Sequence, residues 1–395
     1  MPLTAPRPAT RAAALAPPGG RGFLLLLAAT VGAFSNYAPM LSVVPLWSAE
    51  GGSRGAGLGA ATGVTMAATV AVQCCMARLT ARYGARAMFV AGALLLGLPT
   101  PLYALSTAMG PVLAVSAVRG AGFGMVAVAG STLVPALVPA ARRGGAVGWY
   151  GVATALPQVV CLPLGVWAAG RFGFTAVFAA SAVPAVVAAP LVAAVRVPRA
   201  APARAGGRPA GAVAAWRQAA PVAVLAAAAC AMGGATSYLP PALGTDTAPL
   251  VLFALAAGIV AGRWFAGVWS DRRGTGGLLV PGMAVCAAGV AGWAAAVAVP
   301  GCAGLVAPAA GVLYGLGFGV VQNDTLVLMF ERAGEGGVAS AGSLWNMAYD
   351  GGAGVGAPAL GLAAAGFGLP GAFTALTALL AAALAPARRT ARKPR

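Results

Sequence analysis

The chemistry of two ionisable side chains inside long apolar stretches, Asp350 and Arg119, is the first guide to function. Asp350 falls in such a stretch, with Asn346 one helical turn before it and Tyr349 beside it. Residues four apart share one face of a helix, so Asn346 and Asp350 would point the same way. A carboxylate kept from water can bind and release a proton, which predicts a proton or cation carrier. A hydrogen bond between helices is the plainer alternative.

Arg119 is the second such group, about eight residues into another apolar segment. A lone guanidinium at that depth is costly in lipid, so it should face a cavity. An anionic solute, a carboxylate or backbone carbonyl groups are the partners that could pair with it. A structural anchor to carbonyl groups is the alternative to a binding role.

Other polar side chains within apolar segments predict the lining of a solute cavity. Asp324, beside Gln322 and Asn323, is a further candidate for proton coupling. A solvated or locally paired acid is the alternative for Asp324, because it lies close to the expected membrane interface. The remaining candidates supply neutral hydrogen-bonding groups: Asn36, Tyr37, Gln158, Ser237, Tyr238, Asn346 and Tyr349.

The composition excludes most other chemistry. The 395 residues include no histidine and only seven acids, which removes histidine-based catalytic systems and makes a carboxylate metal cage unexpected. We therefore expect no enzyme activity, no metal and no cofactor. The net charge of +18 does not indicate nucleic-acid binding, because the arginines sit in short gaps between apolar runs. Glycine strings such as 120–124 follow no strand, so they are not nucleotide-binding loops.

The elements that position these residues are membrane-spanning helices. Apolar residues make up 60% of the chain and charged residues 8%, against about 25% charged in a soluble domain. A spanning helix needs about 20 apolar residues. Breaks at charged or Gly/Pro clusters predict twelve such helices, over 22–47, 56–79, 87–106, 111–138, 146–169, 174–195, 218–241, 248–269, 277–299, 305–330, 337–364 and 370–386.

The basic residues predict the orientation of these helices. With the N-terminus in the cytoplasm, 21 Lys and Arg residues fall in cytoplasmic segments, and only Arg54 and Arg171 fall in outer loops. This asymmetry is typical of membrane proteins and predicts a multi-pass protein of the bacterial cytoplasmic (plasma) membrane with both termini in the cytoplasm. A cleaved signal peptide is disfavoured, because the first apolar run is too long.

An internal repeat predicts two parallel halves. Residues 120–124 recur as 315–319 and Pro163 recurs as Pro358, both at an offset of 195; residues 77–84 recur as 267–274 at an offset of 190. The matches keep chain order and membrane orientation, as a duplicated bundle requires. We expect a disordered cytoplasmic N-terminus (1–21), a six-helix half (22–195), a cytoplasmic linker (196–217), a second six-helix half (218–386) and a basic cytoplasmic tail (387–395).

These features resemble the major facilitator superfamily along nearly the whole chain. The family's loop pattern G-x-x-x-D-[RK]-x-G is complete at Gly267, Asp271, Arg272 and Gly274. Its first copy keeps Arg82 and Gly84, but alanines replace the leading glycine and the aspartate at positions 77 and 81. Arg119 before the glycine string 120–124 fits a second mark of the family. The mark typical of antiporters is reduced to Pro163 and Gly165.

The resemblance implies an all-α integral membrane fold with twelve transmembrane helices in two parallel-related six-helix halves. It also implies that Arg119 takes part in proton coupling. The loop pattern implies a cytoplasmic gate, in which Asp271 could pair with the neighbouring arginines or cap the next helix. A charge cluster that only sets topology is the alternative. The gate residues are Arg82, Gly84, Gly267, Asp271, Arg272 and Gly274.

The predicted function is secondary active transport of a small organic solute across the lipid bilayer, coupled to protons and carried out by a monomer. Few charges line the expected cavity, which suits an apolar or amphipathic solute and favours export, as in drug or metabolite efflux. Uptake of a small organic anion through Arg119 is the alternative within the class. A non-transporting membrane scaffold or sensor is the alternative outside it. A channel would need a continuous polar lining, which the sequence does not show.

Overall fold

The computed structural model describes residues 20–139, 142–196, 212–334 and 337–391, and these form helices joined by short turns. The first group of helices, here the N-group, comprises α2 (Arg21–Glu50), α3 (Ala56–Tyr83), α4 (Ala85–Gly97), the short η1 (Thr100–Leu105), α5 (Met109–Leu137), α6 (Arg143–Phe172) and α7 (Phe174–Ala193). The second, the C-group, comprises α8 (Ala212–Arg273), α9 (Leu279–Ala298), η3 (Pro300–Cys302), α10 (Ala303–Ala333), α11 (Val338–Ala382) and α12 (Leu384–Ala391).

Ten helices in the described part of the chain are long and apolar enough to cross a membrane. Two of them are unusually long, because α8 has 62 residues and α11 has 45. Each contains one glycine outside helical geometry, Gly244 with φ 72° and Gly368 with φ 68°. Glycine adopts positive φ without a steric penalty. A kink at one glycine therefore stands where the sequence predicts a loop between two helices.

Two predicted boundaries differ from the structure. α8 begins at Ala212, six residues before the predicted start of that helix, and α12 occupies the first residues of the predicted basic tail. Most of the predicted N-terminal segment (residues 1–19) and of the predicted linker (197–211) lies outside the described residues, as do residues 392–395.

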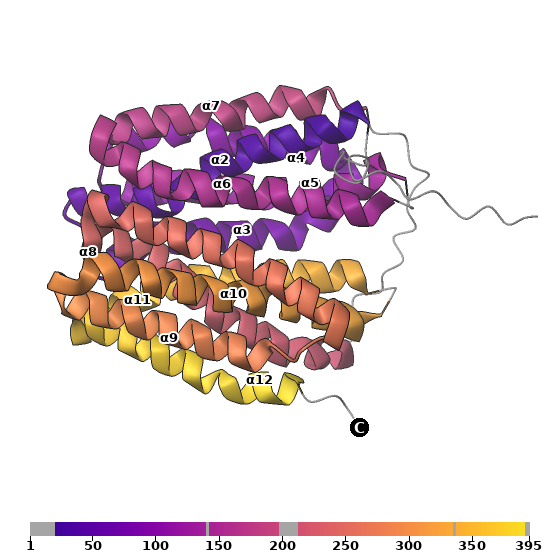
Figure 1. The fold of residues 1–395 in the computed structure, drawn as a ribbon. Helices are drawn as coiled ribbons and strands as arrows, with labels where there is room; N and C mark the ends of the chain where they lie inside the picture. Colours follow the sequence, from indigo (N-terminus) through magenta and orange to yellow (C-terminus); the bar gives the residue numbers. More distant parts are fainter. Residues whose placement is uncertain (1–19, 140–141, 197–211, 335–336, 392–395) are drawn as a thin grey trace, which may run out of the picture.

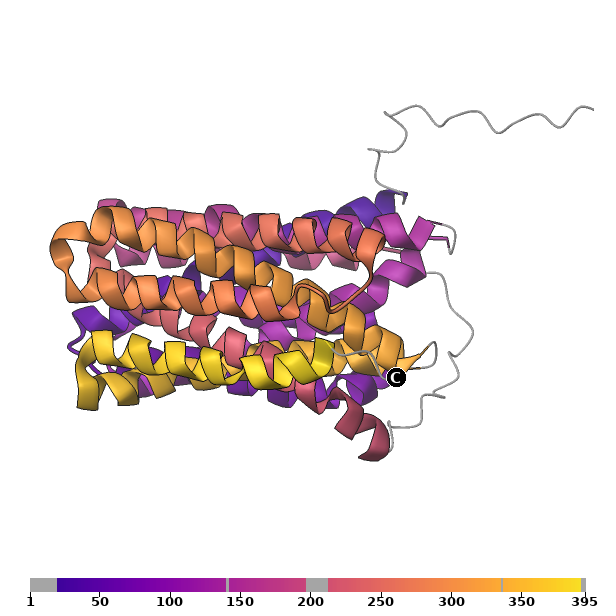
Figure 2. The same ribbon diagram turned by 60° about the horizontal axis from the view of Figure 1, so that its bottom comes forward.

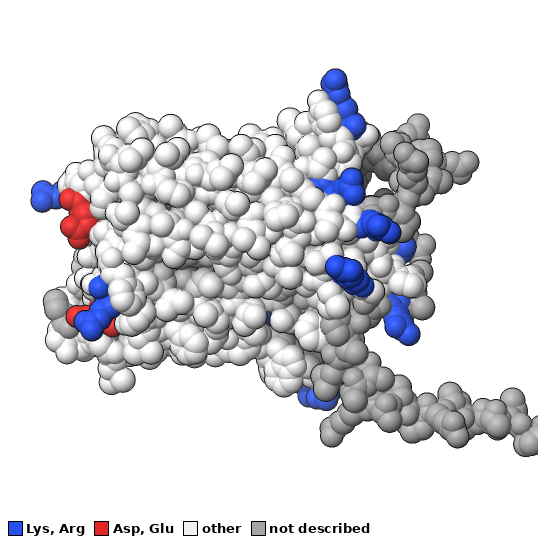
Figure 3. All heavy atoms as spheres, turned by 90° about the horizontal axis from the view of Figure 1, so that it is seen from above, with Lys and Arg blue, Asp and Glu red and all other residues white. Residues whose placement is uncertain are grey.

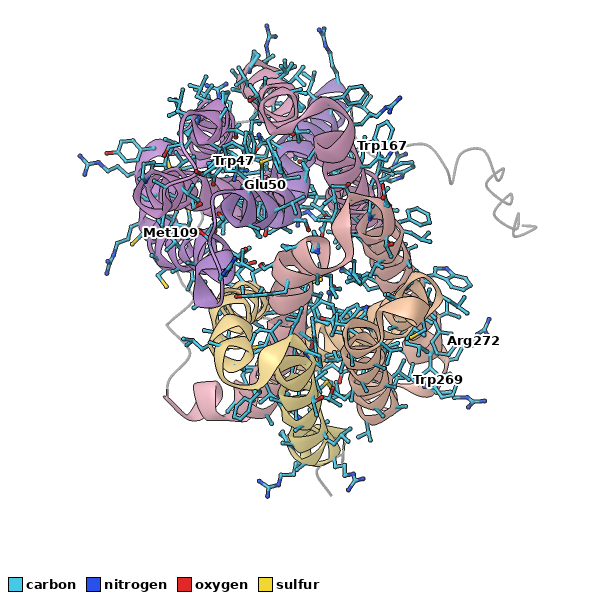
Figure 4. The ribbon with its side chains drawn as sticks, turned by 90° about the vertical axis from the view of Figure 1, so that its left-hand side faces the viewer. Trp47, Glu50, Met109, Trp167, Trp269 and Arg272 are labelled. Atoms are coloured by element: carbon cyan, nitrogen blue, oxygen red, sulfur yellow. The ribbon has the colours of Figure 1, made fainter. Side chains whose placement is uncertain are left out.

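The helices lie side by side in two bundles that share one long axis. In Figure 1 the N-group, drawn in indigo to magenta, lies above the C-group, drawn in salmon to yellow. The end-on view in Figure 4 shows the two groups as separate clusters of helices that meet along one seam. Figure 2 shows that the helices run nearly the whole length of the molecule, as spans of one slab would.

Charged side chains gather at the two ends of this slab and leave the middle uncharged on the face shown in Figure 3. We name the end where α2 begins and where α3 and α8 end the basic end, because Arg21, Arg82 and Arg273 lie there. The opposite end, here the far end, carries Glu50 and Arg171. The uncharged belt between the two ends is the surface that acyl chains require.

The repeated glycine strings make equivalent contacts in the two groups. A Cβ on Gly120 of α5 would overlap the Thr65 carbonyl oxygen of α3, and one on Gly315 of α10 would overlap the Leu255 carbonyl oxygen of α8. The middle glycines of the strings, Gly122 and Gly317, face α4 and α9 in the same way. Small residues allow helices to approach this closely in a membrane. Each string therefore lets one helix pack against two neighbours.

The turn glycines also recur in matched geometry. Gly84 ends α3 with φ 82°, and Gly274 ends α8 with φ 84°. Each donates its backbone N–H to the carbonyl oxygen four residues earlier, over 2.9 Å in both cases. Gly173, between α6 and α7, and Gly368 lie 195 residues apart and both have positive φ. Glycines with positive φ therefore occur at equivalent positions of the two repeats.

Candidate functional site

Arg119 lies at the centre of the N-group, and its side chain is only 2% exposed. Its Nε lies 3.0 Å from Thr100 Oγ1 and 3.3 Å from the Leu96 carbonyl oxygen. The two terminal nitrogens donate to Asn36 Oδ1 at 2.9 Å and to the Tyr103 hydroxyl at 3.3 Å. These partners are all neutral oxygens. Arg119 therefore bonds to neutral groups within the N-group, of which only Leu96 offers a backbone carbonyl oxygen.

The partners of Arg119 connect several helices through further hydrogen bonds. Asn36 of α2 donates to Thr100 Oγ1 at 3.0 Å and to the Ser181 carbonyl oxygen of α7 at 2.8 Å. The Tyr103 hydroxyl lies 2.8 Å from Ser116 Oγ of α5. All these side chains are buried. A buried polar network of this kind is strong only while every member keeps its partner.

Replacing Arg119 by glutamine should destabilise the folded protein. The change leaves Asn36 Oδ1 and the Tyr103 hydroxyl without their donor, and each buried unsatisfied group costs about 1–3 kcal/mol. Lysine should not restore stability, because an ammonium group cannot reach acceptors arranged around a planar fork. The temperature of half-unfolding in detergent measures the effect, with Arg171→Gln at the far end as the matched control. An unchanged temperature for Arg119→Gln would contradict the anchoring role.

Tyr37 lies beside this network and turns toward the seam between the groups. Its ring stacks on Phe123 with centroids 3.6 Å apart and an interplanar angle of 3°. Tyr37 and Arg119 line one small cavity of about 10 Å³, with Thr62 and Thr65 of α3 on its other side. That volume suits about one water molecule. Tyr37 is also close enough to Asp350 and Arg119 to interact with both charges.

Asp350 forms a hydrogen bond that joins the two groups of helices. Its Oδ2 accepts from Nε2 of Gln73 on α3 over 2.7 Å, and the Asp350 side chain is 5% exposed. The Oε1 atom of Gln73 is buried and has no hydrogen-bond partner among the described residues. A bond to an ionised carboxylate is about twice as strong as one between neutral groups. The strength of this contact between the groups therefore depends on the charge of Asp350.

Closer to the far end, the two groups make several direct contacts. The hydroxyl oxygens of Thr62 and Ser237 lie 3.0 Å apart, and the Tyr238 hydroxyl donates to the Gly55 carbonyl oxygen over 2.8 Å. A Cβ on Gly59 of α3 would overlap the Ala357 carbonyl of α11. An apolar cluster that includes Leu252 of α8 joins the same end of the N-group. Ser237 and Tyr238 thus belong to this closed contact.

Asp324 lies on α10 and bonds to the turn before α9 at the basic end. It is 2% exposed, and its Oδ2 accepts from the backbone N–H of Leu278, the residue just before α9, over 3.2 Å. A carboxylate at the N-terminus of a helix stabilises the unpaired N–H groups there. The neighbouring Asn323 Nδ2 is buried and has no partner among the described residues. The Asp324 carboxylate therefore has a nearby backbone partner at the start of α9.

The remaining neutral candidates divide into two sets. Gln158 and Asn346 bond to their own helices, through Thr154 O at 3.3 Å and Gly342 O at 3.1 Å. Gln322 instead accepts a hydrogen bond from Arg263 of α8, and Tyr349 stacks on Phe318 with centroids 5.8 Å apart. The predicted cavity residues therefore do not all converge on one point.

The predicted gate residues lie at the basic end. Arg82 is exposed and its guanidinium carbon lies 5.3 Å from the centre of the Tyr83 ring. Arg272 and Trp269 project outward from the C-group, away from the N-group (Figure 4). A Cβ on Gly267 would meet open space, unlike one on the packing glycines. The side chain of Asp271 lies outside the described residues, so the structure does not show its partner.

Two residues of this region were missed by the sequence reasoning. Gln73 pairs with Asp350 across 277 positions of sequence, and one glutamine within α3 gave no local sign of that partner. Arg263 lies inside α8, and its NH1 group lies 3.3 Å from Gln322 Oε1. An arginine inside an apolar segment was itself the signal that could have identified it.

Comparisons with known proteins complete the description of the chain. The profile of the Major Facilitator Superfamily matches residues 24–357. No curated protein sequence matches the chain. A mutant of the nucleoside transporter NupG superposes with a TM-score of 0.77 at 12% identity, over 93% of this chain and 99% of that chain.

Two further solved structures share the fold. A bacterial homologue of the human lysosomal transporter Spinster, inward-facing and occupied, gives a TM-score of 0.74 at 15% identity, over 93% of this chain and 96% of that chain. A D-xylose–proton symporter gives 0.71 at 16% identity, over 92% of this chain and 96% of that chain. Identities this low indicate a common fold and leave the solute of this chain open.

Proposed function

The chain belongs to the major facilitator superfamily, and from this premise we propose that it exports a small organic solute across a bacterial cytoplasmic membrane by proton-coupled alternating access. The solved relatives are transporters of the same fold. The proposal rests above all on one contact, the hydrogen bond between Gln73 and Asp350 that joins the two groups of helices.

The orientation proposed for the chain puts the basic end in the cytoplasm. Arg82, Arg273 and the other arginines of that end would then follow the positive-inside rule. Dividing α8 at Gly244 and α11 at Gly368 would give twelve spans and return both termini to the same side. The N-group and the C-group would then be the two rocking halves.

The tight contacts near the far end support a state that is closed to the outside. Gly59 packs directly against Ala357, and Tyr238 donates a hydrogen bond to Gly55, so the two groups are in contact there. A transporter alternates between states in which one side is closed and the other accessible. Movement to the outward-facing state would have to break these far-end contacts and remake others at the basic end.

Asp350 is the proposed proton carrier because its charge controls a contact between the moving parts. An ionised Asp350 holds Gln73 by a charge-assisted bond, which strengthens the α3–α11 contact. A proton on Asp350 would weaken that bond and favour separation of α3 from α11. Protonation would thereby bias the equilibrium between the two states, and any ligand that binds one state better does the same.

Transport in liposomes tests this proposal. The purified chain would be reconstituted around a pH-sensitive dye, and a panel of small amphipathic organic compounds would be added one at a time under an imposed pH gradient. We expect at least one compound to move protons through the protein and to accumulate until a protonophore is added. Saturable flux that ignores the protonophore would reject proton coupling. The absence of flux with every compound would favour the scaffold alternative.

A further inference from the structure

A second arginine lies at depth in the spans and has few partners. Arg263 of α8 lies ten residues before the end of that helix at Arg273, about 15 Å along the axis. Its side chain is nevertheless exposed. A guanidinium that faces acyl chains at half the depth of the hydrocarbon core is costly. Arg263 is therefore expected to face water between the two groups of helices.

The hydrogen bonds of Arg263 leave most of its donors unused. Of its five N–H groups, one reaches an acceptor in the described structure, Gln322 Oε1, at the long distance of 3.3 Å. Tyr349 lies near enough to interact with its charge. Arg119 differs, because four acceptors surround it. The fork of Arg263 is thus free to hold a planar anion through two parallel bonds.

The internal repeat shows which partner Arg263 lacks. The offset of 190 that relates Thr65 to Leu255 in the glycine contacts also relates Gln73 to Arg263. The offset of 195 that relates Pro163 of α6 to Pro358 of α11 relates Ala155 to Asp350. Gln73 has the carboxylate of Asp350 as its partner. The matching position for Arg263 is Ala155, so none of the described residues supplies a carboxylate at that place.

We propose that Arg263 binds the carboxylate of the transported solute, in the space between the register positions of Arg263 on α8 and Ala155 on α6. This inference rests on the proposed transport function and names its substrate class, an amphipathic organic monocarboxylate. Gln322 would position the guanidinium. The partly exposed rings of Tyr349 and Trp345, which stack on each other, supply an apolar surface next to the charge for the rest of the solute, and the buried Phe318 ring packs behind Tyr349.

Because Arg263 has no carboxylate partner within the described residues, the transporter would need a bound solute in order to change state. If the two groups close around Arg263 in the other state, an empty site leaves a guanidinium desolvated and unpaired, which is strongly unfavourable. A bound carboxylate supplies the opposite charge and removes that penalty. The loaded transporter can then change state, whereas the empty one is held back.

Binding to the full-length purified chain tests the solute class. The temperature of half-unfolding would be measured with a panel of aromatic and aliphatic monocarboxylates, each beside its uncharged amide. We expect at least one acid to stabilise the protein where its amide does not. In Arg263→Gln, the acid concentration needed for half of that stabilisation should rise about 10- to 100-fold. Arg263→Lys should retain part of it, and Arg171→Gln all of it. Equal stabilisation by acids and amides, or no effect of Arg263→Gln, would overturn the inference.

A carboxylate introduced at position 155 tests, without any solute, whether that position faces Arg263. Ala155→Asp should stabilise the native chain by pairing with Arg263 and should abolish stabilisation by carboxylates. In the Arg263→Gln background the same change should destabilise, since the new carboxylate has no partner. Equal effects of Ala155→Asp in both backgrounds would refute the proposed register. Arg263-dependent carboxylate binding without proton-driven flux would reject the proposed coupling and leave this site standing.

Discussion

Replacing Asp350 by asparagine is expected to abolish solute accumulation driven by a pH gradient and to leave solute exchange intact. Asparagine keeps the size of the side chain and can still bond to Gln73, so the contact between α3 and α11 survives. It cannot gain or lose a proton. The transporter would then carry solute in both directions with no link to the pH gradient.

The size of the effect follows from the energy in the gradient. One pH unit corresponds to about 1.4 kcal/mol per proton, which sustains a roughly tenfold solute gradient when one proton moves with each solute. For the Asp350→Asn chain, the ratio of solute concentrations on the two sides of the membrane should be about one. This ratio is measured as solute accumulation in liposomes at a fixed pH difference. Exchange of labelled for unlabelled solute is recorded on the same preparation.

Asp324→Asn is the matched control for this experiment. Asp324 is also a buried aspartate, but it accepts from the backbone of Leu278 at the start of α9. Asparagine there should lower stability and preserve coupling. Undiminished accumulation by Asp350→Asn would remove Asp350 from the coupling step. Loss of coupling in Asp324→Asn with retained coupling in Asp350→Asn would assign the proton to the other carboxylate.

Valine in place of Gly120 or Gly315 is expected to prevent correct folding. A Cβ alone at either position overlaps a backbone carbonyl oxygen of the neighbouring helix, and backbone cannot move aside as a side chain tip can. Overpacking of a well-packed contact costs about 1–3 kcal/mol per site, and valine adds two further carbons at each. The yield of folded protein from membranes, and its temperature of half-unfolding, should both fall sharply.

The same two helices offer matched controls for the glycine variants. A Cβ on Gly110 of α5 or on Gly304 of α10 would meet nothing within 4 Å. Alanine at these positions should leave folding unchanged or improve it slightly, because alanine favours helix by up to about 1 kcal/mol over glycine. Equal tolerance of Gly120→Ala and Gly110→Ala would show that α5 and α3 are not packed as closely as described.

The apolar segments were predicted with ends close to those of the observed helices, because hydropathy and the spacing of charged and Gly/Pro clusters are local signals. The two kinks were not predicted. Loops were expected between 241 and 248 and between 364 and 370, whereas single residues with positive φ, Gly244 and Gly368, are enough to redirect the chain. The sequence shows where the glycines are, but it does not show which of them adopts a positive φ.

The candidate site was predicted less completely than the helices. Asp350 and Arg119 were recognised because charge inside an apolar segment is costly in itself. Their partners were not, since Gln73 and Asn36 reach them only after distant helices pack together. Hydroxyls such as those of Thr65 and Thr69 bond to the carbonyl four residues earlier, so polarity within a helix does not by itself indicate a cavity.

The bonds around Arg119 have a mechanical consequence. One guanidinium, with Asn36 and Thr100, links α2, α4, η1 and α5, and the Asn36 amide extends the link to α7. A force applied to α2 is therefore distributed over most helices of the N-group and does not bend α2 alone. Stiffness of this kind lets a small displacement near the seam be carried to the opposite membrane surface with little loss.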